Sequence, residues 1–176
     1  VPVDYLYDTV TNTCTVNSAE GLEQFVAEIN ADPNKADANI VLGGDIDLND
    51  LTRSRAVASN WTPVGTADAP FTGTFNGNGY TIDAKEKARI FNVNSNNVVL
   101  ENITFINGHI TGRDGGAIYF SSSGKVSNCN FINNTVKSNA DVQGHGAALQ
   151  IGTSYTSLSL GFIDYCNFIN NTVITN

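Results

Sequence analysis

The sequence contains few charged residues, and basic residues are the scarcest among them. Charged residues make up 15% of the 176 positions, well below the roughly 25% of an average soluble domain. Nine Lys and Arg against 17 Asp and Glu give a formal net charge of -8 at pH 7. Nucleic acids are bound through clustered basic residues, so we expect no nucleic-acid partner.

Long apolar runs and methionine are missing as well. No window reaches the roughly 18 apolar residues of a membrane-spanning helix, so we expect no membrane insertion in this segment. The chain has the size of one domain, contains no Met, begins with Val1 and shows no signal peptide. We therefore expect it to be a mature or excised fragment of a longer protein.

Asparagine is abundant where charged residues are scarce. The chain has 24 Asn and 16 Gly, and 41% of its residues are hydrophobic. Low charge with many Asn, Thr and Ser is typical of extracellular proteins, which predicts an extracellular location. Acceptor triplets for N-glycosylation add only weak support, because several arise by chance in such a composition; they occur at Asn60, Asn102, Asn133 and Asn170.

One helix is predicted near the N-terminus, over about residues 18–30. Asn17 can act as its N-cap, and Glu20 follows three residues later as in a capping box. Pro33 lies just beyond the predicted end of the helix. Residues 1–48, with this helix, are predicted to cap the open end of the fold, which would otherwise expose strand edges. The apolar stripe of the helix consists of Leu22, Phe25, Val26 and Ile29.

Alternation of apolar and polar residues begins after the helix. Residues 40–48 alternate with period two, which predicts a strand with one buried face. Short strands are also expected at 71–75 and 80–82, with a turn at 76–79 that the Asn-Gly steps favour. Residues 50–60 are interpreted as a loop or short helical insert. In this interpretation residues 49–98 form initial coils and residues 99–176 form repeat coils.

The C-terminal half repeats itself. Residues 102–107, 128–133 and 165–170 align, and the last two copies continue identically as Asn-Thr-Val. Two glycine segments, 115–118 and 144–149, lie between the copies. Repeats whose strands are constant but whose loops differ in length are typical of a β-solenoid, because a loop that projects outward does not disturb the stacked strands.

Alternate positions in each copy are expected to point the same way. If successive coils stack about 4.8 Å apart, equivalent residues of the three copies would form two ladders. Each residue of a ladder would then be covered by its equivalents in the coils above and below. The Asn residues that follow would cap backbone groups where the strand turns. The residues assigned to this structural repeat are Ile103, Phe105, Gly115, Gly116, Ala117, Ile118, Cys129, Phe131, Asn134, Gly146, Ala147, Cys166, Phe168 and Asn171.

These motifs resemble the repeats of polymorphic membrane proteins and of the adhesin-like surface proteins of methanogenic archaea. The Gly-Gly-Ala-Ile motif occurs at 115–118, and Phe-x-x-Asn occurs at 131–134 and 168–171. Segments 61–65 and 71–82 resemble the region that precedes such repeats. The first copy departs from the pattern, because Gly108 stands where the last Asn is expected.

The resemblance implies an all-β fold, a right-handed parallel β-helix with a short capping helix, and a surface location. It transfers no binding site, because the shared motifs are structural. We therefore expect a monomeric, non-catalytic adhesin module that attaches to a surface protein or glycan of another cell, or supports a region that does. A purely structural stalk is a further alternative.

A carbohydrate-active β-helix enzyme is the alternative from a different class. The triplet Gly144-His145-Gly146 resembles one found in polygalacturonases, but the paired carboxylates that glycoside hydrolysis needs do not precede it. The triplet also falls where a Gly-Gly-Ala repeat is expected. Arg113 with Asp114 could supply part of a lyase site, although an exposed ion pair is the simpler interpretation. We predict no catalytic, cofactor or metal site.

Other side chains also have a chemical and a structural interpretation. Asp45, Asp47 and Asp50 could offer oxygens to Ca²⁺, but their spacing does not match an EF-hand. Cys129 and Cys166 could be bonded between adjacent coils; two buried free thiols are the favoured interpretation.

Three remaining residues have side chains that could bind a metal or contact a sugar. His109 has no companion at the spacing of metal ligands and is interpreted as structural or exposed. Trp61 and Tyr80 could stack on sugars, but burial is the favoured interpretation for both.

Overall fold

The computed structural model describes residues 4–48, 64, 71–86, 88–93, 98–113, 115–120, 124–140, 144–151 and 161–175. These residues form an all-β structure with one α-helix, α1 (Ala19–Ala31), and a 3-10 turn, η1 (Pro33–Lys35). Within these ranges no helix is long and apolar enough to cross a membrane. The strands are β1 (Tyr5–Asp8), β2 (Thr13–Val16), β3 (Asn39–Leu42), β4 (Ile46–Asp47), β5 (Thr74–Asn76), β6 (Thr81–Asp83), β7 (Phe91–Val93), β8 (Val98–Glu101), β9 (Thr104–Ile106), β10 (His109–Thr111), β11 (Ile118–Phe120), β12 (Gly124–Ser127), β13 (Asn130–Ile132), β14 (Thr135–Lys137), β15 (Leu149–Ile151), β16 (Gly161–Asp164), β17 (Asn167–Ile169) and β18 (Thr172–Ile174).

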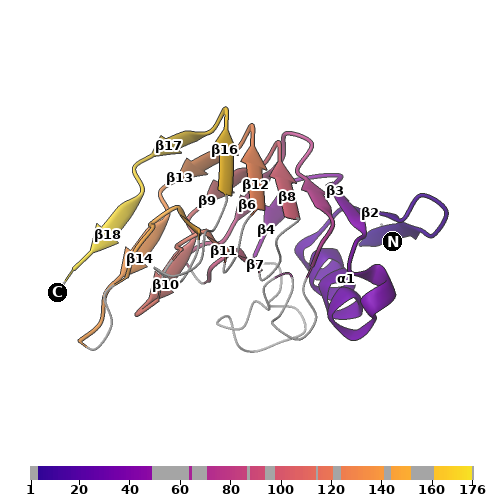
Figure 1. The fold of residues 1–176 in the computed structure, drawn as a ribbon, viewed down its shortest axis with the longest axis horizontal. Coiled ribbons are helices and arrows are strands. Elements are labelled where there is room, and N and C mark those ends of the chain that lie inside the picture. The colour runs from indigo at the N-terminus through magenta and orange to yellow at the C-terminus, as the bar shows by residue number, and fades with distance from the viewer. Residues whose placement is uncertain are drawn as a thin grey trace.

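The strands build four sheets, and from β3 onward consecutive strands fall into different sheets. The seven-stranded sheet has the order β1-β2-β3-β5-β8-β12-β16, and the five-stranded sheet has the order β17-β13-β9-β6-β4. Two three-stranded sheets have the orders β10-β14-β18 and β15-β11-β7. All pairings among these strands are parallel except β1 with β2. Each sheet is therefore a stack of strands from successive segments of the chain (Figure 1).

Three repeats can be followed through the C-terminal half. The first repeat comprises β8 to β11, the second β12 to β15, and the third β16 to β18. Equivalent strands pair in register, so that Phe131 lies beside Phe105 on one side and beside Phe168 on the other. A slip by one residue would turn every inward side chain outward, so this register decides which residues are buried.

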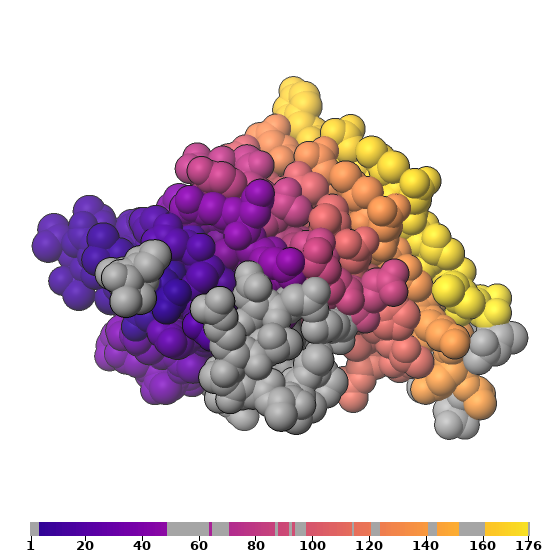
Figure 2. Space-filling model, turned by 180° about the vertical axis from the view of Figure 1, so that it is seen from behind, coloured from indigo at the N-terminus to yellow at the C-terminus, as the bar shows by residue number. Residues whose placement is uncertain are grey.

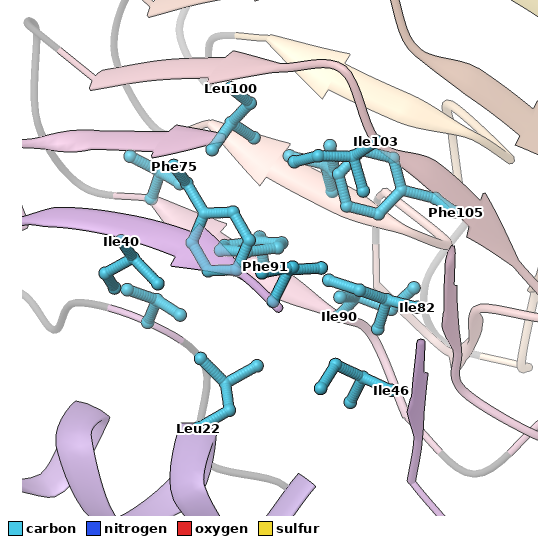
Figure 3. Close-up of a cluster of buried hydrophobic side chains, with 14 of the residues drawn as sticks. Leu22, Ile40, Ile46, Phe75, Ile82, Ile90, Phe91, Leu100, Ile103 and Phe105 are labelled. Carbon is cyan, nitrogen blue, oxygen red and sulfur yellow. The ribbon is translucent and has the colours of Figure 1, made fainter. Parts of the chain in front are cut away.

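One hydrophobic core runs between the sheets. On β9 and β13 the central Phe is buried and its two neighbours are partly exposed, as the alternation of a strand requires. The ring of Phe91 contacts those of Phe75 and Phe105 edge to face, with centroid distances of 4.8 and 5.8 Å. Figure 3 shows these rings with Leu22 of α1, which extends the same core to the helix.

Helix α1 lies at the opposite end of the stack from the third repeat (Figure 1). Its predicted apolar stripe is confirmed, because all four residues of the stripe are buried. Asp32 follows the helix, and η1 begins at Pro33, where the sequence predicts the end.

The predicted N-cap of α1 is wrong. Ser18, not Asn17, caps the helix, and its side-chain oxygen accepts a hydrogen bond from the Gly21 backbone N–H at 3.0 Å. The Ser18 hydroxyl in turn donates to an Asp4 carboxylate oxygen at 2.8 Å, a contact from outside the helix that local spacing does not show. Glu20 therefore lies in the first turn and not at the capping-box position.

Three strand predictions also change. Strands β1 and β2 form an antiparallel hairpin, although the first 13 residues show no clear period and no strand is predicted there. Residues 40–48 divide into β3 and β4, which lie in different sheets on either side of Gly43 and Gly44. Likewise β5 and β6 lie in different sheets, and Asn78 and Gly79, with φ of 51° and 84°, form the corner between them. The predicted insert at 50–60 lies outside the described residues.

Candidate functional site

The strands of the repeats are joined at corners where asparagine adopts the left-handed backbone conformation. Asn102 and Asn128 stand at the corner that leads into the five-stranded sheet. Asn107, Asn133 and Asn170 stand at the corner that leaves it. Their φ values lie between 51° and 56°, a region that Asn tolerates better than most non-glycine residues. Part of the asparagine excess is therefore required by these changes of chain direction.

A second asparagine, directly after the corner that leaves the five-stranded sheet, ties the second and the third repeat to the repeat before it. Buried Asn134 donates from Nδ2 to the Phe105 carbonyl at 3.2 Å, and its Oδ1 accepts from the Gly108 N–H at 2.8 Å. Asn171 donates from Nδ2 to the Phe131 carbonyl at 2.9 Å, and its Oδ1 accepts from the Asn134 backbone N–H at 3.0 Å. We call each such pair of bonds an asparagine bridge. The prediction that Asn amides cap backbone groups is confirmed at both positions.

The outward surface of the five-stranded sheet carries a row of polar side chains. Asn130 Nδ2 donates to Thr104 Oγ1 at 3.1 Å, and Asn167 Nδ2 donates to Asn130 Oδ1 at 2.8 Å. We call this row, with the aliphatic row beside it, the outer face. The aliphatic row consists of Ile106, Ile132 and Ile169.

Two glycines occupy equivalent corners before β11 and β15. Gly115 and Gly146 have φ of 73° and 62°. A Cβ atom would lie 2.3 Å from the Ile118 carbonyl oxygen at Gly115 and 2.5 Å from the Leu149 carbonyl oxygen at Gly146. Because Ile118 and Leu149 are paired in register, Gly146 stands at the position of Gly115, which agrees with the repeat interpretation of the Gly-His-Gly triplet.

The residues between these glycines and the strands are closely packed. A Cβ atom on Gly116 would lie 2.0 Å from the Ala147 carbonyl oxygen, so only glycine fits there. Ala117 and Ala147 are buried, and Ile118 begins β11 with its side chain in the core.

Of the residues considered for carbohydrate chemistry, the described part of the chain brings Arg113 and His145 close together. The His145 carbonyl accepts from the Gly115 N–H at 2.9 Å, and the Arg113 carbonyl lies 3.0 Å from the place a Gly144 Cβ would occupy. Arg113 and His145 therefore share a corner of neighbouring repeats, and the His145 side chain is exposed. Asp114 and Asp141, the nearest acids in sequence, lie outside the described residues.

The acids considered for Ca²⁺ have other contacts. Asp45 Oδ1 accepts from the Thr81 N–H at 2.8 Å, and Asp47 pairs with Lys85 at 3.3 Å. Asp50 lies outside the described residues. In the described part of the chain, no group of three or more His, Cys, Asp or Glu could hold a metal ion.

Asp83 links two neighbouring corners of the five-stranded sheet. Its carboxylate pairs with Lys85 Nζ at 2.8 Å and accepts from Asn107 Nδ2 at 2.8 Å. Partial burial opposes its ionisation, but the hydrogen bonds from Lys85 and Asn107 outweigh burial and hold the pKa of Asp83 below its usual range. Asp83 is therefore most stable as a carboxylate in the folded chain.

The remaining candidates for metal or sugar contacts are His109, Tyr80 and Trp61. His109 lies on β10, with Nε2 at 3.3 Å from Thr111 Oγ1 on the same strand. Tyr80 is partly buried against the core. Trp61 lies outside the described residues.

Sequence reasoning missed a buried cation before β7. The Arg89 side chain donates from Nε to the Gly115 carbonyl at 3.0 Å, and its guanidinium carbon lies 5.0 Å from the centroid of the Tyr119 ring. Arg89 is only 9% exposed. Arg89 ends the charged segment that begins at Lys85, so nothing in the local sequence distinguishes it as a buried residue.

A second missed cluster joins β1, α1 and η1. Glu28 accepts hydrogen bonds from the Tyr5 hydroxyl and from Lys35 Nζ. Lys35 Nζ also lies 5.3 Å from the centroid of the Tyr7 ring. The hydrogen bond to Glu28, followed by burial, raises the pKa of Tyr5 to about 12. These contacts fasten the N-terminal hairpin to the helix.

The cysteines are free thiols, as the favoured interpretation predicts. Cys14 and Cys129 are fully buried, and burial raises the pKa of each to about 12. Ile103, at the position of Cys129 in the first repeat, is also buried. Cys166 is the last residue of the ladder formed by Ile103, Cys129 and Cys166, and it is only partly buried. The prediction that each residue of this ladder is covered on both sides is therefore wrong for Cys166.

The third repeat is also exposed at the last member of the Phe ladder. Phe168 stacks on Phe131 with a centroid distance of 5.0 Å, yet Phe168 is 49% exposed and Phe131 is 0% exposed. This difference arises because Phe168 has a described neighbour on one side only. Among the described residues the third repeat forms an outer layer (Figure 2), and we call its side away from the second repeat the end face. Its exposed large apolar residues are Phe162, Ile163, Tyr165, Phe168, Ile169, Val173 and Ile174.

No family model, curated protein or solved structure matches this chain. Its function is therefore inferred from the fold and the surfaces described above.

Proposed function

We propose that this chain is a non-catalytic, extracellular adhesin-like module that attaches to a surface protein or glycan of another cell, or supports a region that does. We also propose that its stacked sheets form a right-handed parallel β-helix with α1 as its cap. Parallel strands of one sheet need crossover connections, and in nearly all proteins these crossovers are right-handed. The passage of the chain through other sheets between two paired strands supports this proposal.

The in-register repetition of the strands is the observation that carries the proposal. Equivalent positions on β9, β13 and β17 follow one another at the strand spacing of about 4.8 Å. The outer face therefore presents similar polar and aliphatic groups at each step. A periodic ligand, such as a glycan chain, could engage several of these steps at once and gain affinity from many weak contacts.

The first test is saturable binding of the monomeric chain to a glycan array and to intact partner cells. Ile132→Glu places a charge in the middle of the outer face and should abolish binding there. Lys125→Glu, which changes an outward residue of the seven-stranded sheet, is the matched control and should leave binding unchanged. Equal binding by both variants would contradict the assignment to the outer face.

The same wells distinguish the module from a carbohydrate-active enzyme. Release of reducing ends or unsaturated uronides would be measured beside binding. Binding without turnover supports the adhesin proposal. Turnover that disappears in His145→Ala would overturn it, and absence of both binding and turnover would favour a structural stalk.

A further inference from the structure

We propose that Asn133 is an N-glycosylation acceptor, whose side chain receives a glycan from a lipid-linked donor. This inference rests on the extracellular location in the proposed function, because N-glycosylation acts on exported chains. Asn133 and Thr135 define one of the four acceptor triplets in the sequence. Such triplets often arise by chance, so the surroundings of these two side chains in the folded chain decide whether a glycan fits there.

The fold turns the first and third residues of this triplet outward. Asn133 lies at the corner between β13 and β14, with φ of 55°, and its side chain is exposed. The middle residue, Asn134, is buried and is held inward by the asparagine bridge to the first repeat. Thr135 begins β14 on its outward side, since the next residue, Val136, is buried. The bridge therefore leaves both side chains that define the triplet on the outside of the stack.

The polar groups of these two side chains have no partner among the described residues. The Asn133 amide and the Thr135 hydroxyl both lack a hydrogen bond there, whereas the Asn133 backbone N–H donates to the Ile169 carbonyl at 3.0 Å. The backbone of the corner is therefore held while its side chain is not. Strands β13 and β14 are each paired on both sides, so the exposure of Asn133 does not arise from an uncovered strand. A glycan on Nδ2 displaces no contact that the structure describes.

A second triplet, formed by Asn102 and Thr104, has both side chains engaged. Asn102 is partly buried, and its Nδ2 donates to Asn76 Oδ1 at 3.3 Å. Thr104 Oγ1 accepts from Asn130 Nδ2 at 3.1 Å. The neighbouring corner also packs closely here, because a Cβ on Gly77 would lie 2.5 Å from the Asn102 carbonyl oxygen. We therefore expect no glycan on Asn102 in the folded chain.

The equivalent corner of the first repeat has no acceptor triplet. Asn107 stands there, but His109 takes the place of the Thr. The Asn107 side chain is also engaged, because its Nδ2 donates to the Asp83 carboxylate at 2.8 Å. In the third repeat Asn170 stands at this corner and begins the same Asn-Asn-Thr triplet. The fourth triplet, at Asn60, lies outside the described residues.

The transfer step replaces one proton of the Asn133 amide with a sugar. Nδ2 attacks the anomeric carbon of a glycan that is carried on a polyprenyl phosphate or pyrophosphate. A carbon–nitrogen bond forms as the bond from that carbon to the phosphate oxygen breaks, the lipid phosphate leaves, and a base of the transferase takes the Nδ2 proton. The amide keeps one N–H and its carbonyl oxygen, and both can be hydrated at this exposed corner.

The test is a tryptic peptide map, by mass spectrometry, of the full chain secreted from eukaryotic cells that glycosylate exported proteins. Cleavage after Lys and Arg puts Asn133 in peptide 126–137 and Asn102 in peptide 90–113, apart from the other two acceptor triplets. We expect a glycan on peptide 126–137 and none on peptide 90–113. An appended secretion leader supplies the location, so an unmodified Asn133 would overturn this inference and leave the proposed function untouched.

Two substitutions of the same kind separate the two triplets. Thr135→Val removes only the hydroxyl that defines the triplet, keeps Asn133 in its corner, and should abolish the glycan on peptide 126–137. Thr104→Val destroys the Asn102 triplet in the same way and is the matched control, which should leave that glycan unchanged. Loss of the glycan in both variants, or in neither, would contradict the assignment to Asn133.

The glycan should also leave the fold intact, because the Asn133 side chain makes no contact that a sugar would displace. The secreted chain and its Thr135→Val variant should therefore unfold at midpoints that differ by less than about 4 °C. A markedly lower midpoint for the glycosylated chain would show that the Asn133 side chain is not free to carry a sugar, and would overturn the inference.

Discussion

The ring of Phe131 stacks on the ring of Phe105 with their centroids 5.1 Å apart and an interplanar angle of 19°. Phe131 also stacks on Phe168, so it is covered on both sides. We expect Phe131→Ala to lower the free energy of unfolding by about 3–5 kcal/mol, the usual cost of removing a buried Phe. Urea denaturation followed by circular dichroism measures this loss.

Phe168→Ala is the matched control for this prediction. The same ring is removed, but Phe168 is 49% exposed, so the loss should be only about 1–2 kcal/mol. A loss at Phe168 as large as that at Phe131 would show that the third repeat is covered in solution.

Gly115 should be intolerant of any side chain. Its φ is 73°, and a Cβ would lie 2.3 Å from the Ile118 carbonyl oxygen. We expect Gly115→Ala to destabilise the fold by roughly 2–4 kcal/mol, because backbone strain adds to a steric clash. Gly79→Ala is the control, since Gly79 also has positive φ but nothing lies within 4 Å of its Cβ position. It should show only the strain of about 1–2 kcal/mol, and thermal denaturation of both variants would compare them.

The three thiols should differ sharply in reactivity. Thiolates are the reactive form, and burial raises the pKa of Cys14 and of Cys129 to about 12. Only Cys166 is partly exposed. We therefore expect iodoacetamide to label one thiol in the native chain and all three in urea, as counted by mass spectrometry. Cys166→Ser should abolish native labelling, and native labelling of Cys129 would contradict its burial.

Asp83 should make stability depend on acidic pH. Its folded pKa is lowered, so its contribution is fully present above the usual Asp range near pH 4 and is lost as pH falls through the lowered pKa. In that window Asp83→Asn should reduce the slope of unfolding free energy against pH by up to about 1.4 kcal/mol per pH unit. Lys85→Met should reduce it partly, because the Asn107 hydrogen bond remains. An unchanged slope in Asp83→Asn would refute the assignment.

Tyr165 is a strained residue whose replacement should stabilise the chain. It has φ of 49° at the corner where Asn102 and Asn128 stand in the first and second repeats, and it is 81% exposed. Tyr165→Asn should raise the free energy of unfolding by about 1 kcal/mol, because Asn tolerates this conformation better. Tyr165→Phe keeps the strain and should change nothing, so equal stability of the two variants would contradict this explanation.

The repeated part of the fold could be predicted because each repeat contains the same signals. Phe131, Asn134 and their equivalents recur in one order, and alternation alone indicates which of them face inward. The exposure of Phe168 could not be predicted from the pattern, because burial depends on a neighbour above as well as below.

The N-cap of α1 and the burial of Arg89 were not predicted because they depend on contacts between segments that are distant in the sequence. Ser18 is chosen as the N-cap partly through its bond to Asp4, which lies 14 residues earlier, directly before β1. Asn17 is held elsewhere, since its side chain lies 2.1 Å from where a Cβ of Gly43 would be. The contacts of Arg89 with Gly115 and Tyr119 likewise exist only once neighbouring repeats are stacked.

The links between β10 and β11 (112–117) and between β14 and β15 (138–148) differ in length, yet β11 and β15 remain in register. Insertions and deletions in this link can therefore be accommodated without disturbing the sheets. It is also the place at which a foreign peptide could be grafted for display.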